Sequence, residues 1–176
     1  MTRDAFEHSV RAAGAVLRSG ELLVIGSQAL HASMSGKLPP EALRSVEVDV
    51  AALKGDPDGR LADLIDGSIG EASMFHETFG YYAQGVVEST AVLPAGWRTR
   101  LVRYETRGTA GVVAWCLEPH DLWISKAIAG RPKDVDFCQA LVRLGVVRPG
   151  TLRARLSKVR GLDTKVRDQV ARRIGA

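Results

Sequence analysis

The sequence predicts an α+β fold, in which a mixed β-sheet core is followed by a C-terminal helical region. Three observations support this class. Short apolar and β-branched runs alternate with helical patterns up to Leu117, as in a sheet with helices packed on it. From Pro119 onward only helical patterns follow, separated by Gly and Pro. The 176 residues, 45% of them hydrophobic, suffice for one sizeable core. We therefore expect a core at 1–117 and a helical region at 118–176 packed on it.

The elements of the first half follow from the spacing of apolar residues and from turn residues. Residues 4–18 place apolar side chains on one stripe of a helix, and Gly20 ends it. Residues 75–105 contain many β-formers interrupted by Gly and Pro, which predicts several strands. The other expected elements are strands at 21–25, 45–53 and 111–117, and helices at 27–33 and from 60 to 65.

Four helices are expected in the second half, because Pro suits the first turn of a helix and Gly suits the position after its end. Their expected ranges are 119–129, 132–144, 149–159 and 163–174.

The charge of the chain is unevenly distributed. From Arg143 to the end there are ten Lys or Arg against two acids, which leaves a net charge of −4 on the residues before Arg143 in a chain of net charge +4. A basic region beside an acidic one suits a polyanionic substrate such as RNA. A solvated, arginine-rich helix face explains the same charge about equally well.

The acidic strand is the most informative segment. Side chains two residues apart on a strand point the same way. Glu47 and Asp49 are therefore expected side by side on one face, with Val46, Val48 and Val50 filling the other. Two adjacent carboxylates repel each other unless a cation lies between them, and hard oxygen ligands favour Mg²⁺. The sequence thus predicts a magnesium site.

A Gly-Ser pair follows the preceding strand and opens a helix. Free backbone N–H groups and the helix dipole make such a position suitable for phosphate, so Gly26 and Ser27 are expected to bind it. His31 lies one helical turn further on and is expected on the helix surface. A phosphate site beside a metal site predicts a nucleotide-transfer site.

A second dense segment begins the helical region. Lys126 is the only charged residue between Asp121 and Arg131, in a helix that is otherwise nearly all apolar. A buried, unpaired Lys is costly, so a nucleotide phosphate or a site carboxylate is expected as its partner. The alternative is that Lys126 reaches solvent. Asp134 falls near the apolar stripe of the next helix and is expected to face inward, although a carboxylate also suits that first turn.

The cysteines, the length of the apolar runs and the first residues of the chain bear on the cellular compartment of the protein. Cys116 and Cys138 lack metal-site spacing and lie in apolar surroundings, so buried free thiols are expected. No apolar run approaches the roughly 20 residues that span a bilayer. The first residues show no signal-peptide pattern. We expect a cytoplasmic protein with no membrane partner.

Together, the two motifs of the first half resemble the signature of the nucleotidyltransferase superfamily with the polymerase-beta-like fold. That signature is a hydrophobic strand, Gly-Ser or Gly-Gly, a helix and then an acidic-x-acidic strand. Gly26-Ser27 and Glu47-x-Asp49 match it, with Glu replacing the more frequent Asp at the first acidic position. The resemblance implies a mixed-sheet nucleotidyltransferase core and Mg²⁺ as cofactor.

The segment around Lys126 resembles the helix-borne motif of type IV toxin and abortive-infection nucleotidyltransferases. Lys126, Arg131 and Asp134 match it, with Asp136 as the rival for the last position. Residues 20–155 are also similar to a bacterial family of uncharacterised nucleotidyltransferase-like proteins. The shared segments are Gly-Ser-Gln-Ala-Leu, Glu-Val-Asp-Val, Phe-Gly-Tyr-Tyr-Ala, Leu-Pro-Ala-Gly-Trp-Arg-Thr-Arg, Pro-His-Asp-Leu and Ala-Gly-Arg-Pro-Lys-Asp.

These resemblances imply transfer of a nucleoside monophosphate from an NTP to an RNA (tRNA-like) or protein acceptor, with release of pyrophosphate. They also imply a place in a toxin–antitoxin pair, with a cognate antitoxin as partner. The implied metal ligands are Glu47 and Asp49, the implied catalytic residues are these two with Lys126, and the implied nucleotide-binding residues are Gly26, Ser27, Lys126 and Arg131.

The alternative is a catalytically weak relative that binds a nucleotide or a partner protein as a regulatory component. Members of the superfamily often carry a third carboxylate on a later strand. Glu105 ends one expected strand and Glu118 follows another. Either residue is a candidate for the third carboxylate, and the alternative is that the third carboxylate is missing. Without a third carboxylate the site still suits metal binding, and the argument for catalysis is weaker.

Overall fold

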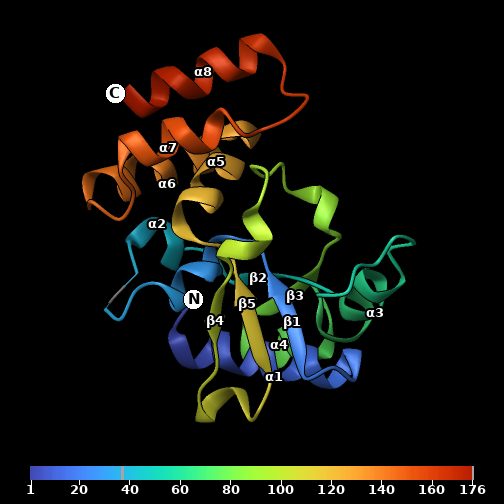
Figure 1. Cartoon of the computed structure of the whole chain (residues 1–176). Helices are drawn as coiled ribbons and strands as arrows, with labels where there is room; N and C mark the ends of the chain where they lie inside the picture. The colour runs from blue at the N-terminus through green and yellow to red at the C-terminus, as the bar shows by residue number, and fades with distance from the viewer. Residues whose placement is uncertain (37, 176) are drawn as a thin grey trace.

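The computed structural model describes residues 1–36 and 38–175 (Figure 1). Its helices and strands, with short 3-10 helices labelled η, are α1 (Arg3–Leu17), β1 (Glu21–Val24), η1 (Ser27–Ala32), α2 (Pro40–Leu43), β2 (Glu47–Ala51), α3 (Arg60–Ile69), α4 (Met74–Phe79), β3 (Tyr82–Gly85), η2 (Glu88–Thr90), η3 (Trp97–Arg100), β4 (Val102–Tyr104), η4 (Arg107–Thr109), β5 (Val113–Cys116), α5 (Pro119–Ala129), α6 (Pro132–Arg143), α7 (Pro149–Leu156) and α8 (Thr164–Gly175).

The five strands form one mixed sheet in the order β3-β2-β1-β5-β4. β1 runs parallel to β5 and antiparallel to β2, β2 runs parallel to β3, and β4 runs antiparallel to β5. Consequently the C-terminal ends of β1 and β5 lie at the same end of the sheet as the N-terminal ends of β2, β3 and β4. Gly26, Glu47 and Tyr82 all lie at this end of the sheet. The sheet and the helices that follow it confirm the expected α+β class.

One face of the sheet is covered by α1, which runs behind the strands in Figure 1. Val24, Val48 and Val50 are fully buried on this face. Tyr104 of β4 meets Phe6 of α1 edge to face, with 5.3 Å between the ring centroids. Burying this apolar layer is the main force that holds the helix on the sheet. The opposite face carries the side chains of the candidate site.

The four C-terminal helices pack against one end of the sheet (Figure 1). Their apolar side chains, including Leu122, Ile124 and Leu141, belong to the same continuous core as the strands. Trp123 donates a hydrogen bond from Nε1 to the Cys138 carbonyl oxygen at 2.9 Å, which ties α5 to α6. Over residues 118–175 the structure confirms the four expected helices, three of them starting at the Pro that predicted them.

The expectation of several strands over 75–105 was wrong in part. Residues 74–79 form α4, because Ser73 accepts a hydrogen bond from the His76 N–H at 3.2 Å and caps its first turn. Gly80, with φ of 73°, then ends the helix in the left-handed conformation that glycine adopts readily. Only β3 and β4 are strands in this segment, and the rest is η2, η3 and loop. Local capping outweighed the β propensity of the aromatic residues.

Two smaller expectations about the site also need correction. The helix expected after Gly26 is a six-residue 3-10 helix rather than an α-helix. The acidic strand begins at Glu47, so Val46 lies outside it and is 46% exposed instead of filling the apolar face.

Both cysteines are buried free thiols, as expected. Burial raises the pKa of Cys116, and it raises that of Cys138 to about 12. Neither thiol is therefore a nucleophile near neutral pH. In the described part of the chain, no helix combines the length and the apolar character that crossing a bilayer requires.

Candidate functional site

The acidic pair lies on one face of β2, as its spacing predicted. Glu47 is paired with Tyr82 and Asp49 with Gln84 in the parallel neighbour β3, so these four side chains share a face. Tyr82 donates its hydroxyl to Glu47 Oε2 at 3.2 Å. Burial, followed by the negative charge of Glu47, raises the pKa of Tyr82 to about 12. The phenol therefore stays protonated and holds one oxygen of Glu47 in place.

Asp49 packs directly against the turn that ends β1. A Cβ built on Gly26 would lie 1.6 Å from Asp49 Oδ2, so glycine is required by this close approach. Burial raises the pKa of Asp49, Lys126 opposes the shift and Glu47 adds to it. Across residues 1–36 and 38–175, no salt bridge within 4.0 Å reaches Asp49. Asp49 is thus half-buried, and Lys126, Lys133 and Arg131 act on its charge only from beyond 4.0 Å.

Lys126 comes from α5 and faces this pair from the helical region. Its Nζ lies 3.4 Å from Oδ1 of Asp134, and the Lys side chain is 16% exposed. Lys126 therefore has a carboxylate partner, which is Asp134 of α6 and not Glu47 or Asp49 of the acidic strand.

Asp134 itself is only 2% exposed, which confirms that it faces inward. Arg131 donates to Asp134 from Nε at 2.6 Å and from Nη2 at 3.3 Å. Burial opposes ionisation of Asp134, but the Arg131 hydrogen bond and the charge of Lys126 outweigh it and hold its pKa below the usual range. Asp134 thus fixes both cations beside the acidic strand. Asp136, its rival, lies at the cavity described next but is exposed.

A cavity of about 290 Å³ opens between β2, α2, η1 and the helical region. Lys133, on the first turn of α6, reaches into it and places Nζ 3.6 Å from Oε1 of Glu47. Sequence reasoning missed Lys133 and Tyr82, although Lys133 lies between two residues that it had singled out. The lining residues are Ser27, Glu41, Arg44, Ser45, Val46, Glu47, Lys126, Lys133, Asp134, Asp136 and Phe137.

Ser27 lies in the wall of this cavity as the first residue of η1. Gly26 precedes it with an extended backbone and is the N-terminal cap. The first N–H groups of a helix have no partner within it, and in a 3-10 helix the same holds for its first turn. The Gly26-Ser27 turn therefore presents polar groups next to the acidic strand.

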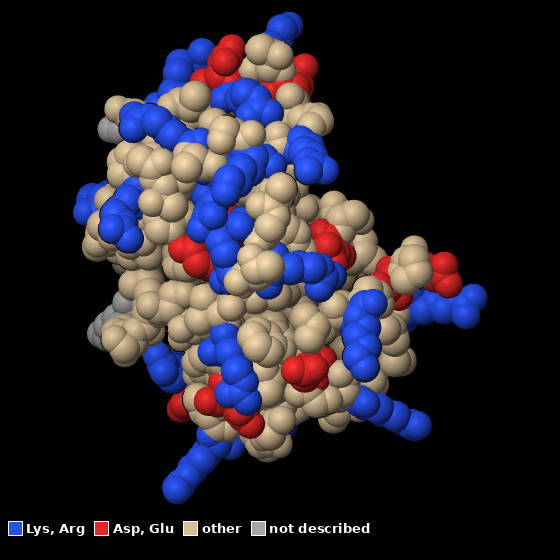
Figure 2. Space-filling view, viewed as in Figure 1, with Lys and Arg blue, Asp and Glu red and all other residues tan. Residues whose placement is uncertain are grey.

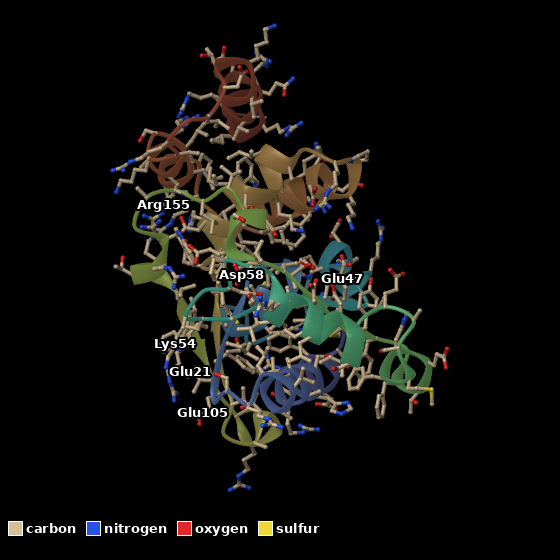
Figure 3. The ribbon with its side chains drawn as sticks, turned by 90° about the vertical axis from the view of Figure 1, so that its right-hand side faces the viewer. Glu21, Glu47, Lys54, Asp58, Glu105 and Arg155 are labelled. Carbon is tan, nitrogen blue, oxygen red and sulfur yellow. The ribbon has the colours of Figure 1, made fainter. Side chains whose placement is uncertain are left out.

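Neither candidate for a third carboxylate is among the residues that line the cavity. Glu105 is exposed, pairs with Arg103 and lies at the far end of the sheet from Glu47 (Figure 3). Glu118 caps α5, where it accepts from the His120 N–H at 3.1 Å. The residue beside Asp49 on β3 is Gln84, an amide.

The amide of Gln84 is also engaged, because its Nε2 donates to the carboxylate of Asp66 at 2.9 and 3.0 Å. Among the described residues, no group of three or more His, Cys, Asp or Glu could hold a metal ion. The acidic site is a pair.

His31 lies away from the cavity. It is 5% exposed and stacks on Phe6, with 4.7 Å between ring centroids, so the expected surface position was wrong. Burial, followed by the charge of Arg3, lowers the pKa of His31 to about 4. The α1 helix, which the local pattern could not place against η1, accounts for the difference.

The donor set fits Mg²⁺. Two hard carboxylates lie two residues apart, and burial leaves one of them short of positive charge. Mg²⁺ is commonly held by one or two carboxylates together with substrate phosphates and water, so a protein pair suffices. Glu47 and Asp49 would hold the ion, and it would supply the charge that Asp49 lacks.

Taken together, a mixed sheet with a Gly-Ser turn, an acidic strand and a facing Lys-Arg pair defines a protein of the nucleotidyltransferase superfamily. Residues 9–170 match the family described as a nucleotidyltransferase of unknown function (DUF6036), and the chain belongs to that family. No curated protein and no solved structure matched the chain.

Proposed function

We propose that this protein is a Mg²⁺-dependent nucleotidyltransferase that moves a nucleoside monophosphate from an NTP to an RNA (tRNA-like) or protein acceptor. The observation that carries the proposal is Asp49, a half-buried carboxylate packed on the Gly26 turn that forms no salt bridge within 4.0 Å among the described residues. Keeping such a group has a stability cost, and metal binding is the function that explains it.

The positions of the residues support the roles that we propose for them. Glu47 and Asp49 would hold the metal, and the ion would supply positive charge beside the phosphate groups. Ser27 and the first N–H groups of η1 bind phosphate oxygens. Lys126 and Arg131 contact the triphosphate, and Asp134 keeps both cations turned toward it.

The basic helices support an RNA acceptor over a protein one. The upper part of the face in Figure 2, formed by α7 and α8, carries many Lys and Arg and few acids. Arg155 and Arg167 are used by the fold, one in an ion pair with Asp121 and the other in bonds to the Leu156 and Val159 carbonyls. The exposed cations, free to meet a polyanion, include Arg148, Arg153, Lys158, Arg160, Lys165 and Arg172.

A role as the toxin of a toxin–antitoxin pair, acting in the cytoplasm and neutralised by a cognate antitoxin, belongs to the same proposal. Modification of tRNA would stop translation, and an inhibitor would then be needed. Co-expression with the adjacent gene product tests it: growth arrest by the wild type, relieved by that product and absent with Asp49→Ala, is the expected result. Unimpaired growth on overproduction of an active enzyme contradicts the toxin role.

A second candidate is a catalytically weak protein that binds a nucleotide or a partner as a regulator on the same fold. It is favoured by Gln84, an amide beside Asp49 where a third carboxylate would complete the site. The acidic pair alone would still bind metal and nucleotide.

Label transfer separates the two. Purified protein is incubated with Mg²⁺, each α-labelled NTP in turn and total tRNA, with the protein itself as a second acceptor. Label in RNA or protein with the wild type and with Glu105→Ala, but not with Asp49→Ala, is expected for the enzyme. No label, with Mg²⁺-dependent NTP binding still seen by calorimetry, indicates the regulator. Neither label nor binding contradicts both.

A further inference from the structure

Both oxygens of Glu47 are engaged by side chains of the protein. Tyr82 donates to Oε2 at 3.2 Å, and the Lys133 ammonium lies 3.6 Å from Oε1. The Tyr82 ring is buried and its contact is fixed. The Lys133 side chain is 65% exposed, so its contact with Oε1 is the one that an incoming cation can displace more readily.

The three cations whose charges act on Asp49 differ in how firmly they are held. Lys126, 16% exposed, is fixed by the buried Asp134, and Arg131 binds the same carboxylate through two nitrogens. Within residues 1–36 and 38–175, the one salt bridge of Lys133 is the long contact with Glu47. A flexible, mostly solvated Lys in a single long ion pair exchanges partners at little cost. Its backbone, however, is anchored, because the next residue is the buried Asp134.

The position of Lys133 therefore puts it in competition with a metal. A cation binding Glu47 Oε1 must displace the ammonium, which lowers the affinity of the metal-free protein for a metal alone. When the metal arrives with a triphosphate, the displaced ammonium is still at the cavity and can pair with a phosphate oxygen.

We propose that Lys133 is an exchange counter-ion: it neutralises Glu47 in the empty site and pairs with the triphosphate in the loaded one. This inference rests on the proposed function, because it assumes that Glu47 and Asp49 hold the metal. Its consequence is that the protein binds metal and nucleotide together in preference to metal alone. Premature metal binding, without substrate, is disfavoured.

The Lys133→Met variant should bind the metal alone more tightly and the metal–nucleotide complex more weakly. In Lys133→Met, Mn²⁺ alone should bind about two- to fivefold more tightly, as expected from loss of a competing exposed ion pair. The Mn²⁺ complex of a non-hydrolysable α,β-methylene NTP should bind about tenfold more weakly, since a charge-assisted bond to phosphate is lost. Free Mn²⁺ is measured by electron paramagnetic resonance, and nucleotide binding by calorimetry with each of the four bases.

Three variants serve as controls. Lys165→Met removes an exposed Lys of α8 and should change neither affinity. Lys133→Arg keeps the charge and should restore most of the nucleotide affinity. Asp49→Ala should abolish Mn²⁺ binding, which assigns the measured binding to this site. Circular dichroism establishes that each variant is folded.

The outcomes are distinguishable. If Lys133→Met weakens both affinities, or changes neither while the wild type binds Mn²⁺ and nucleotide, the exchange role is wrong and the proposed function stands. If the wild type binds no Mn²⁺ with or without nucleotide, the proposed function fails and the exchange role fails with it.

Discussion

Asp121, which is fully buried, and Asp49, which is half-buried, are two acidic residues near the same end of the sheet, and their surroundings are opposite. Asp121, fully buried on α5, accepts from Arg100 at 2.7 and 3.0 Å and lies 3.4 Å from Nε of Arg155. Asp49 has no such partner among the described residues. A buried charge that serves the fold is compensated by the fold, whereas one that serves a ligand awaits its compensation from the ligand.

The largest effect on the free energy of unfolding is expected at Asp121, the carboxylate that is paired with arginines of the fold. Asp121→Ala would leave the guanidinium groups of Arg100 and Arg155 without their shared acceptor in a mostly buried position. We expect a loss of about 3–5 kcal/mol in the free energy of unfolding, as for other broken buried pairs. Urea denaturation measures it. A loss below about 1 kcal/mol would show that the Asp121 cluster is not structural and would remove the contrast with Asp49.

His31 supplies an intermediate case, a buried ionisable group that is kept neutral. Its pKa is lowered from 6.5 to about 4, so the unfolded chain takes up the proton first as the pH falls. The part of the folding stability that depends on neutral His31 is fully present above pH 6.5. It is lost as the pH falls from 6.5 through 4. The loss should be about 2–3 kcal/mol.

The pH dependence of urea unfolding between pH 4 and 7 measures this loss. His31→Met, which packs on Phe6 without a titratable group, should flatten that part of the profile. An unchanged slope would assign the pH dependence to other groups.

A smaller effect on the free energy of unfolding is expected at Gly26, whose turn packs against Asp49. Gly26→Ala places a methyl group 1.6 Å from Asp49 Oδ2, and the carboxylate must move. We expect a cost of about 1–3 kcal/mol, typical of overpacking. In the Asp49→Ala background the cost should fall by about 1 kcal/mol or more, because the clashing atom is absent. Equal costs in the two backgrounds would contradict the close approach.

The smallest effect on stability is expected at Asp49 itself. Because burial raises its pKa, the ionised carboxylate is less stable in the folded chain than in water. Asp49→Ala should therefore change the free energy of unfolding by less than about 1 kcal/mol, or increase it, while abolishing metal binding. Thermal and urea unfolding give the first value and Mn²⁺ titration the second. Unfolding of this variant would mean that Asp49 is a structural residue like Asp121.

Part of the site could be predicted from the sequence because its information is local. The spacing of Glu47 and Asp49 puts them on one face of any strand. The isolated Lys126 in an apolar helix requires a partner. Pro119, Pro132 and Pro149 mark the helix starts, and all three are correct. The error at 74–79 came from a capping residue, Ser73, whose contribution outweighed the pattern of its neighbours.

The sequence by itself determined the class of fold, the acidic pair and the need of Lys126 for a counter-charge, since each follows from periodicity or from the cost of burying charge. Only the tertiary structure decided that Asp134 is that counter-charge, that Tyr82 and Lys133 hold Glu47, and that Glu105 lies at the far end of the sheet. These are contacts between residues far apart in the chain or on different elements. Strand order and helix packing set them, and neither is encoded in any single segment.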